Sequence, residues 1–546
     1  MNKIAQYLNE HLLGEVTADD AIRDNFSHDA SILSIKPELV IHPRVTNDIR
    51  KIARFAWQLA EKGHVLPITM RGSGSDKTGG AIGSGILINT PAHLNKVIFV
   101  STKAKNQFIH LQPGVSLATI NEALKATGML LPTYYSTAGY ETIGGAVANN
   151  LSGIQSGLHG STGDWVERLE VVLANGDLIE TTRISKGELN KKKGLQTFEG
   201  EIYRKVDAII DDNKQTIDDK IANEATDNTG YPGIAKVKNR DGSFDLTPLL
   251  VGSQGTLGLI SEIVMRTTFY STEESIIVAT FDNPETARDA ADTIVGQQPT
   301  ILEVIDGQLF DTAHNLGKKY IFSEQYLDRH VGTIMYISFN DISDHTRHKK
   351  TKHVLKLLSK VGSTVYTNPE YMIEELQLVC EVESILLQNN SKGESQPPII
   401  DGASVPGDRR EEFIVALDEL ANKHHISLPL HIRWLDDIIY TRPVLKLHEV
   451  SDKQKTFKLI NDYLDLVIKF GGSMCADACE GRLKAGAAYA RLDDDELDIY
   501  KQIKDVFDPL GILNTGVKQK SDLKTLVSAL DPDYSIAEFA KYSPSN

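Results

Sequence analysis

A glycine-rich stretch, RGSGSDKTGG at residues 71–80, combines residue types that suit a phosphate ligand. It holds four glycines, three hydroxyl side chains and one lysine, and apolar runs precede and follow it. Glycines let backbone N–H groups approach a phosphate without Cβ atoms in the way, and hydroxyls add donors. The stretch therefore predicts a buried loop that binds phosphate. A glycine-rich structural turn without a ligand is the alternative.

Two common phosphate-binding motifs do not fit this stretch. A Walker A loop has glycine directly before its lysine, but Asp76 precedes Lys77. The Rossmann fingerprint needs a glycine three residues after Gly74, where Lys77 stands. Because the sequence also shows no strand that would bind Mg²⁺ beside the loop, an NTPase has little support.

A second group of chemically active residues lies in LHIRWLDDIIYTR, residues 430–442. If the central Asp-Asp pair is a two-residue hairpin turn, Arg433 lies opposite Tyr440, and His431 lies opposite Arg442. Alternation along the strands then places all four side chains on one face. Because arginine binds carboxylates and phosphates through paired hydrogen bonds, the hairpin predicts an anion site. Arg433, with Arg442, would hold the anion, and Tyr440 or His431 would handle a proton. A polar strand surface facing solvent is the alternative.

Composition narrows the class of partner. The chain of 546 residues has 58 basic and 74 acidic side chains, a net charge of −16, and such a surface repels nucleic acid. Three cysteines are too few for a disulfide framework and favour a cytoplasmic location. No run of 18 apolar residues occurs, so we expect no transmembrane segment. Peripheral contact with the inner face of a membrane stays open.

Mixed helix and strand patterns must position these residues. The length indicates two or three packed units. Residues 169–181, LEVVLANGDLIET, predict a hairpin with a primed two-residue turn at Asn175-Gly176. The Lys- and Asp-rich region 184–242 predicts a solvated helical insertion rather than a binding tail. From residue 272 onward the order strand-helix-strand-strand-helix predicts a split βαβ sheet in a separate, smaller domain.

Six segments with glycines and small polar residues resemble one protein family in order and spacing. They are LPTYYSTAGYETIGGAVANNLSG, LHGSTGDWVERLEVVLANGDLIE, LLVGSQGTLGLISEI, IIDGASVP, GGSMCADACEGR and DPLGILNTG. Together they are similar to FAD-linked oxidases and dehydrogenases of the vanillyl-alcohol oxidase/p-cresol methylhydroxylase superfamily. The most similar branch holds D-lactate dehydrogenase, the glycolate oxidase D-subunit and D-2-hydroxyglutarate dehydrogenase. The likeness covers nearly the whole chain.

The resemblance implies an α+β fold with a two-subdomain FAD-binding domain of the p-cresol methylhydroxylase type and a ferredoxin-like α+β substrate domain. We expect the FAD-binding domain at residues 1–270 and the substrate (cap) domain at 271–490. Residues 491–546 would return to the flavin.

The same resemblance implies which residues hold FAD. Residues 72–80 would cradle the pyrophosphate, 142–145 would lie along the flavin and ribityl chain, and 255–260 would lie near the adenosine half. Asn514 would bring the C-terminal segment back to the isoalloxazine. Because some relatives attach FAD through a histidine in the loop, which this loop lacks, we expect noncovalent FAD. The expected cofactor residues are Arg71, Gly72, Ser73, Gly74, Ser75, Asp76, Thr78, Gly79, Gly80, Pro132, Thr142, Ile143, Gly144, Gly145, Asn149, Gly153, Gly255, Thr256, Gly258, Ile260 and Asn514.

Metal-bearing members of that branch use an H-x-G-D-G-N-x-H hairpin and a G-E-H-G segment. This chain has Arg433 and Tyr440 where the two hairpin histidines stand. Asp477 replaces the glutamate and Ala478 the last histidine. We therefore expect no metal, and we expect Arg433 to supply the positive charge. The predicted catalytic residues are His431, Arg433, Tyr440, Arg442 and Asp477.

The predicted function is FAD-dependent oxidation of a small hydroxylated anion, with a D-2-hydroxy acid such as D-lactate as the first candidate. Hydride would pass to the flavin, and electrons would continue to a quinone, a cytochrome or another carrier. Two alternatives remain open. One is a flavin-binding protein or partner subunit with altered catalysis, and the other is an oxidoreductase for a different alcohol or sugar acid.

Overall fold

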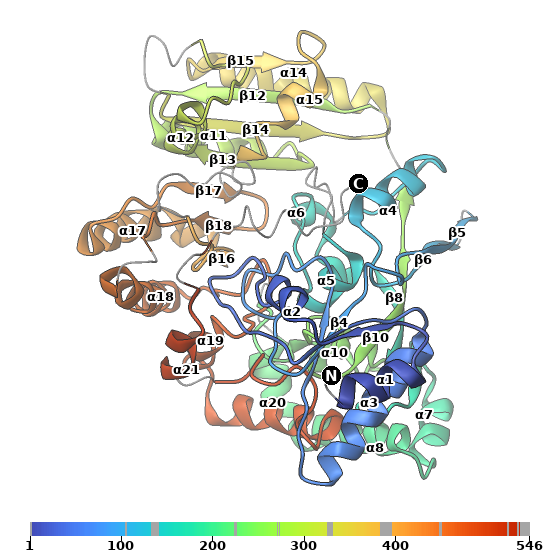
Figure 1. Cartoon of the computed structure of the whole chain (residues 1–546). Helices are drawn as coiled ribbons and strands as arrows, with labels where there is room; N and C mark the ends of the chain where they lie inside the picture. Colours follow the sequence, from blue (N-terminus) through green and yellow to red (C-terminus); the bar gives the residue numbers. More distant parts are fainter. Residues whose placement is uncertain are drawn as a thin grey trace.

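The structure is a computed structural model of the chain (Figure 1). It describes residues 3–103, 106–132, 141–222, 227–269, 271, 273–324, 331–382, 396–446, 450–520, 523–531 and 534. Residues 133–140 of the family-like stretch that begins at Leu131, and much of the segment after residue 520, lie outside this set.

A four-stranded sheet carries the glycine-rich stretch. Its strand order is β1 (Glu15–Thr17), β2 (Leu39–His42), β4 (Ile86–Asn89) and β3 (Ile68–Arg71). β4 pairs in parallel with both β2 and β3, while β1 is antiparallel. Helix α3 (Thr46–Glu61) buries its apolar side, which includes Ile49, Ile52 and Ala56, in the same core cluster as these strands. The glycine-rich stretch begins where β3 ends.

A five-stranded antiparallel sheet forms the rest of the N-terminal half. Its order is β5 (Val97–Lys103), β6 (Asn106–Leu111), β10 (Leu259–Arg266), β8 (Val166–Val172) and β9 (Leu178–Thr181). The predicted hairpin is β8–β9, but its two-residue turn was wrong. Leu173 N–H donates to Asp177 O at 2.8 Å, so three residues form the loop, and Gly176 takes a φ of +84°.

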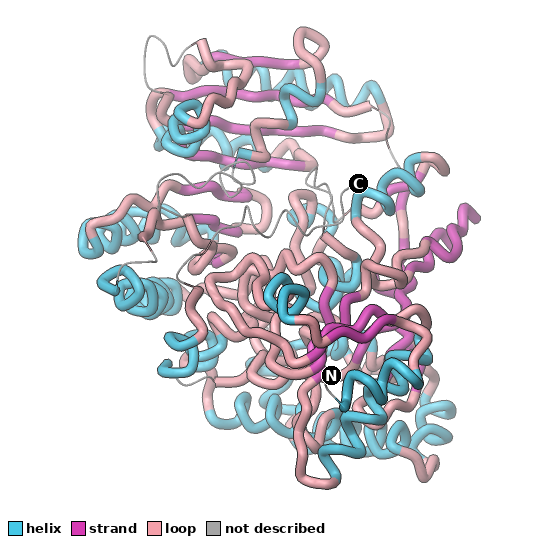
Figure 2. The backbone as a smooth tube through the Cα atoms, viewed as in Figure 1, coloured by secondary structure: helices cyan, strands magenta, loops and turns pink. Residues whose placement is uncertain are grey.

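A seven-stranded antiparallel sheet forms the upper part of Figure 1 and has the long strands of Figure 2. Its order is β15 (Thr364–Thr367), β12 (Ser275–Phe281), β14 (Thr333–Phe339), β13 (Ile301–Asp306), β17 (Leu430–Arg433), β18 (Ile438–Thr441) and β16 (Ala403–Ser404). Helices α11 (Pro284–Val295) and α14 (Asp344–Lys360) connect its first four strands in the ferredoxin-like order. The predicted α+β class and the split βαβ unit are confirmed.

The β17–β18 hairpin has the predicted face but not the predicted register. His431, not Arg433, pairs with Tyr440, and Arg433 pairs with Ile438. Four residues rather than two therefore form the turn. They are held from outside the hairpin, because the Arg410 guanidinium lies 3.7 Å from the centre of the Trp434 ring and binds Asp437. A register shift of two residues keeps every side chain on its original face.

The polar region 184–242 is helical, as predicted, but not simply solvated. It holds α7 (Lys186–Lys193), α8 (Phe198–Asp212) and short turns. α8 buries Ile202, Tyr203 and Val206 and packs against α20 (Asp494–Phe507). The region is therefore part of the core of the N-terminal half.

The remaining elements are short connections and covering helices. They are α1 (Lys3–His11), α2 (Asp20–Asn25), α4 (Leu117–Lys125), β7 (Met129–Leu130), α5 (Ile143–Asn149), α6 (Ser156–His159), α10 (Thr247–Leu250), β11 (Thr268–Phe269), α12 (Gly307–Asn315), α15 (Ile373–Gln377), α17 (Arg410–His424), α18 (Val450–Lys469), α19 (Ala485–Tyr489) and α21 (Leu523–Ser528). None of the described helices combines the length and the apolar character needed to cross a membrane.

The C-terminal segment returns to the first sheet. Ile68 N–H donates to Ile512 O at 2.7 Å, and Asn514 N–H donates to Ile68 O at 2.8 Å, so this segment runs alongside β3. Lys518 anchors it further, because its Nζ lies 2.7 Å from Glu480 Oε2 and both side chains are fully buried. The proposed domain bounds at residues 270 and 490 stay a prediction.

The Lys518–Glu480 pair gives a first testable prediction. Lys518→Met should destabilise the fold by about 3–5 kcal/mol, because it leaves the Glu480 carboxylate buried without its cation. Combining it with Glu480→Gln should recover part of that loss. The measurement is the midpoint of urea denaturation. The control is Lys501→Met, which removes an exposed pair with Asp505 on α20 and should leave the midpoint unchanged. Equal effects of Lys518→Met and Lys501→Met would contradict this account.

Candidate active site

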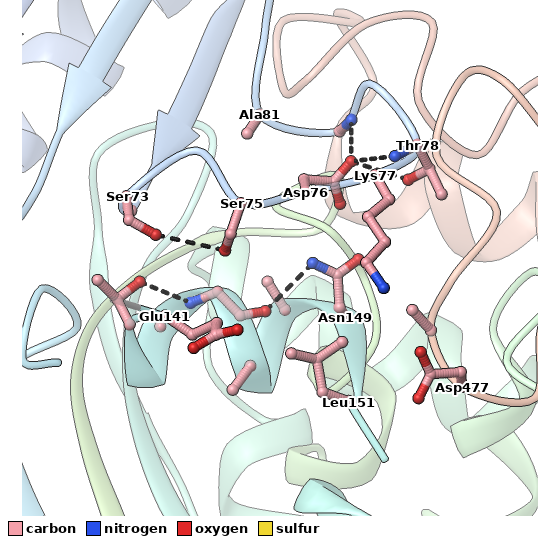
Figure 3. Close-up of a pocket in the computed structure, with 18 of the residues that line it drawn as sticks. Ser73, Ser75, Asp76, Lys77, Thr78, Ala81, Glu141, Asn149, Leu151 and Asp477 are labelled. Atoms are coloured by element: carbon pink, nitrogen blue, oxygen red, sulfur yellow. Dashed lines mark hydrogen bonds between the residues drawn. The ribbon is translucent and has the colours of Figure 1, made fainter. Parts of the chain in front are cut away.

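One cavity of about 310 Å³ unites the glycine-rich stretch with the β17–β18 hairpin. Figure 3 shows the loop above it, and on the opposite side α5, which ends at Asn149, with Leu151 just after it. All five predicted catalytic residues line it, although they come from segments distant in sequence. The predicted cofactor residues that line it are Arg71, Gly72, Ser73, Gly74, Ser75, Asp76, Thr78, Gly80, Thr142, Gly144, Gly145, Asn149, Gly153, Gly255, Gly258 and Ile260.

Five predicted cofactor residues do not line the cavity: Gly79, Pro132, Ile143, Thr256 and Asn514. Ile143 lies fully buried in the apolar core, and Thr256 binds the Tyr231 hydroxyl. Gly79 packs against Leu33. A contact between any of these five and FAD stays a prediction.

Asp76 folds the glycine-rich stretch from within. Its Oδ1 accepts hydrogen bonds from Thr78 N–H at 2.7 Å, Thr78 Oγ1 at 2.9 Å and Gly80 N–H at 2.8 Å (Figure 3). An aspartate that bonds to N–H groups two and four residues further on closes a tight local turn. The acidic side chain that excludes a Walker A motif is therefore a structural part of this loop.

The carbonyl groups of the same stretch are held by two residues from the C-terminal part of the chain. Arg482 donates to Gly79 O at 3.0 Å and to Ile82 O at 2.9 Å. Asn514 Nδ2 donates to Gly80 O at 2.9 Å and also to Gln254 O. Asn514 thus acts on the back of the loop, not within the cavity. The sequence analysis missed Arg482, because nothing near the loop indicates its partner.

With these carbonyls bound from behind, several backbone N–H groups of the loop remain available. The N–H groups of residues 73–77 donate to no acceptor in the part of the chain that the structure describes. Gly72 is packed so closely that a Cβ there would overlap Thr142 Oγ1 at the start of α5. A row of unpaired backbone amides, with glycine at positions 72 and 74, is the donor set that a dinucleotide's phosphates need. The site fits FAD.

A buried carboxyl group lies behind the loop. Asp29 accepts hydrogen bonds from Ser31 N–H at 3.0 Å and from Ala81 N–H at 3.3 Å. Burial, together with the negative charge of Asp76, raises the pKa of Asp29 to about 7. Asp29 can therefore take up a proton near neutral pH.

At the other end of the cavity, Arg433 is the centre of a buried cluster. It donates to Ser152 O at 3.0 Å, to the Tyr440 hydroxyl at 3.1 Å and to Asp436. The Tyr440 hydroxyl in turn donates to Asp477 Oδ1 at 3.0 Å. Arg433 is 4% exposed and Tyr440 8%, so the alternative of a solvent-facing polar surface is wrong.

Two further side-chain pairs surround this cluster. His431 Nε2 lies 2.8 Å from Glu303 Oε2, and Arg442 Nε donates to Asp401 Oδ2 at 2.6 Å. Glu303 lies on β13, so it meets His431 only because β13 pairs with β17. The sequence analysis missed Glu303, Asp401 and Asp436 as partners. The predicted role of Arg433 and Arg442 in holding a substrate anion stays a prediction, and their acidic partners weigh against it.

Burial sets the protonation state of two cavity residues. It raises the pKa of the Tyr440 phenol well above its usual value, against the opposing charge of Arg433. Burial, with the nearby charge of Glu303, likewise raises the pKa of the Cys380 thiol. Tyr440 is thus a neutral hydrogen-bond donor at physiological pH, and Cys380 behaves as a small apolar side chain. The described residues contain no group of three or more His, Cys, Asp or Glu placed to hold a metal ion.

The chain matches two protein families. Residues 37–182 match the family described as "FAD binding domain", and residues 271–517 match "FAD linked oxidases, C-terminal domain". The first match contains the glycine-rich stretch, and the second contains the hairpin and Asp477. The predicted cofactor, FAD, is therefore confirmed.

Known relatives belong to the predicted branch. The chain is 24% identical to a D-2-hydroxyglutarate dehydrogenase of Pantoea ananatis, over 92% of this chain and 50% of that protein. It is 24% identical to the glycolate oxidase subunit GlcD of Bacillus subtilis, over 90% and 91%. It is 22% identical to a D-lactate dehydrogenase of Archaeoglobus fulgidus, over 88% and 90%. The chain spans about half the length of the D-2-hydroxyglutarate dehydrogenases that it matches.

Solved structures share the fold. p-Cresol methylhydroxylase with substrate bound superposes with a TM-score of 0.69 at 12% identity, covering 96% of this chain and 97% of that one. A 4-ethylphenol oxidase from Gulosibacter chungangensis gives 0.67 at 15% identity, covering 95% and 97%. The predicted likeness to this superfamily is confirmed.

Gly72 gives a test of the FAD site. Gly72→Ala should weaken FAD binding about tenfold or more, because its Cβ would displace Thr142 beside the loop. Adding Thr142→Ala removes the overlapping oxygen and should restore part of the affinity. FAD per chain after gel filtration is the measurement. Gly187→Ala, whose Cβ has free space in α7, is the control. Full FAD retention by Gly72→Ala would show that this contact does not shape the site.

The pH dependence of stability tests the protonation of Asp29. An unfolded aspartate releases its proton near pH ~4, whereas folded Asp29 retains it to about pH 7. The folded state then binds more protons between these values, so the free energy of unfolding should fall as pH rises through that window. Asp29→Asn cannot ionise and should reduce the fall.

Urea denaturation at pH 5 and pH 8, at equal FAD content, gives the difference in the free energy of unfolding between the two pH values. It is measured for the wild type and for Asp29→Asn. Asp289→Asn, an exposed aspartate on α11, is the control and should keep the wild-type difference. An unchanged difference in Asp29→Asn would contradict the assigned protonation.

Proposed function

We propose that this chain, which matches an FAD binding domain and the C-terminal domain of FAD linked oxidases, is an FAD-dependent oxidoreductase that oxidises a small hydroxylated anion. A D-2-hydroxy acid such as D-lactate is the first candidate, and the product is the 2-oxo acid. A quinone, a cytochrome or another carrier takes the electrons. One observation carries the proposal: the glycine-rich loop and the Arg433–Tyr440–Asp477 cluster line the same cavity.

Bound FAD supplies the two-electron acceptor for the hydride that leaves the substrate's hydroxyl-bearing carbon. The loop residues 72–80 and the start of α5 would hold it. The chain's own task is then to remove the hydroxyl proton and to orient the carbon.

Tyr440 and Asp477 suit the removal of that proton. The Tyr440 hydroxyl already donates to Asp477 Oδ1 at 3.0 Å. A substrate hydroxyl that donates to the Tyr440 oxygen could pass its proton there while Tyr440 releases its own to Asp477. Asp477 would therefore act as the base, and Tyr440 as the group that contacts the substrate.

Arg433 supports this transfer without needing to bind the substrate. Its Nη1 donates to the Tyr440 oxygen at 3.1 Å, so it stabilises negative charge on that oxygen while the two protons move. Its contacts with Ser152 and Asp436 fix its orientation. His431, held by Glu303, is the second candidate base in the same cavity.

The test is anaerobic mixing of the purified flavoprotein with D-lactate, D-2-hydroxybutyrate and their L-isomers. Loss of the visible flavin absorbance with the D-isomers is the expected result. Tyr440→Phe keeps the ring and should slow flavin reduction about 10²-fold or more, with FAD content unchanged. The control is Tyr7→Phe on the exposed face of α1.

Each outcome has a separate meaning. If no 2-hydroxy acid reduces the wild-type flavin, the proposed reaction is wrong. If the flavin of Tyr440→Phe is reduced as fast as that of the wild type, the proposed reaction stands, but the hydroxyl proton leaves by another route. A loss confined to His431→Gln would assign the base to the His431–Glu303 pair.

A further inference from the structure

Most basic side chains around the cavity are already engaged. Four basic side chains line it: Arg71, Lys77, Arg433 and Arg442. Arg71 donates to His28 O and Ala81 O behind the loop, Arg433 binds Asp436 and Ser152, and Arg442 binds Asp401. Lys77 differs, because it makes no hydrogen bond to any residue that the structure describes. Its nearest acidic atom is Asp401 Oδ2, at 3.8 Å.

Lys77 projects from the loop toward the hairpin. Its Nζ lies 5.8 Å from the centre of the Tyr440 ring, and its side chain is 35% exposed. Figure 3 shows the side chain extending from the loop into the space between Asp76 and Asp477. A lysine ammonium is a mobile point charge with three donors, so it can meet an anion beside Tyr440.

The charge around the cavity limits how many anionic groups a substrate can bring. Four acidic side chains, Asp76, Glu141, Glu303 and Asp477, match the four basic ones that line it. Asp401 and Asp436 lie just behind and neutralise Arg442 and Arg433. A second carboxylate on the substrate would therefore find no spare cation and would be repelled by Asp477 or Glu303.

The remaining surface at this end is apolar. Leu151, Ile154 and Cys380 line the cavity. Ile154 and Cys380 both pack against the apolar cluster under the seven-stranded sheet. This surface suits a short alkyl group and offers nothing to a charged one.

We propose that Lys77 binds the substrate carboxylate, and that the site takes a 2-hydroxy monocarboxylate with a short alkyl side chain and discriminates against dicarboxylates. This rests on the proposed function and narrows it to one substrate class. The carboxylate pairs with the Lys77 ammonium, the hydroxyl faces Tyr440 and Asp477, and the alkyl group faces Ile154 and Cys380. Lys77 is a binding residue, and its removal costs affinity rather than proton transfer.

The test measures equilibrium binding of 2-oxo acids. These acids resemble the proposed product and have no 2-hydroxyl group to oxidise. The probes are 2-oxobutyrate, which has one carboxylate, and 2-oxoglutarate, which has two. Calorimetry and the flavin difference spectrum of the FAD-loaded protein report binding without turnover. We expect 2-oxobutyrate to bind at least about tenfold more tightly than 2-oxoglutarate, because the second carboxylate of 2-oxoglutarate would be buried without a cation.

Variants at position 77 test the residue itself. Lys77→Gln should weaken 2-oxobutyrate binding about tenfold or more, and Lys77→Arg should lose less, because it keeps the charge. FAD content should not change in either. Lys349→Gln, an exposed lysine on α14, is the control.

Several results would overturn the inference. These are equal binding of both acids, binding of neither, or an undiminished affinity in Lys77→Gln. Loss of FAD in Lys77→Gln would assign the residue to the cofactor phosphates instead. Failure of the proposed function reads differently: Lys77-dependent binding of 2-oxobutyrate without flavin reduction by any hydroxy acid would keep this site and reject the reaction. Flavin reduction by a hydroxy acid, together with unchanged 2-oxobutyrate binding in Lys77→Gln, would keep the proposed reaction and reject the Lys77 site.

Discussion

The cofactor site depends on holding the carbonyl groups of the glycine-rich loop from behind. Side chains bind the carbonyls of residues 79, 80 and 82, and the N–H groups of Gly80 and Ala81 bind Asp76 and Asp29, so this part of the loop is fixed. Residues 73–77 line the cavity with N–H groups that bind no acceptor among the described residues. The groups that bind the carbonyls are the Arg482 guanidinium and the Asn514 amide, which lie more than 400 residues further along the chain. These contacts tie the shape of the loop to the packing of the C-terminal segment beside β3. A ligand that binds this folded loop therefore also stabilises the packing of the C-terminal segment.

The substrate end follows a different rule, because its charges are buried and each is compensated within the protein. Arg433 with Asp436 and Arg442 with Asp401 are nearly inaccessible, and so is the hydrogen bond between His431 and Glu303. Such pairs add little net stability, since desolvation offsets their attraction, but removing one partner leaves a costly unpaired charge. Arg433 shows a geometric contribution: Asp436 holds it, and it donates to the Tyr440 hydroxyl, which donates to Asp477. A cluster that is oriented before the substrate arrives needs no rearrangement during proton transfer.

Local patterns in the sequence predicted the features that follow from strand alternation, such as the face on which a side chain lies. The face that gathers His431, Arg433, Tyr440 and Arg442 was predicted correctly although the register was wrong, because a shift of two residues preserves alternation. The turn length could not be predicted, because Arg410, on another element, holds Trp434 and Asp437. The same limit applies to Glu303 and Arg482. Each meets its partner through sheet pairing or chain return, and no local spacing records such a contact. Family resemblance supplied FAD, which the loop composition alone left open against a structural turn.

The two ends of the cavity differ in electrostatics. One end must stabilise phosphate charge, and at the other end the side-chain charges are already paired. FAD phosphates carry charge that backbone dipoles can stabilise, and residues 73–77 offer such dipoles with Asp76 turned inward on Thr78 and Gly80. Arg71, the arginine at this end, donates to His28 O and Ala81 O behind the loop, and its charge lies beside Asp29 and Asp76. Dipoles fall off faster than charges, so the phosphate end leaves the substrate end nearly unaffected. Among the described residues that line the cavity, Lys77 is then the basic side chain that no hydrogen bond fixes, and its ammonium lies near Tyr440. Because the other charges at this end are paired, the charge of Lys77 can select what binds there.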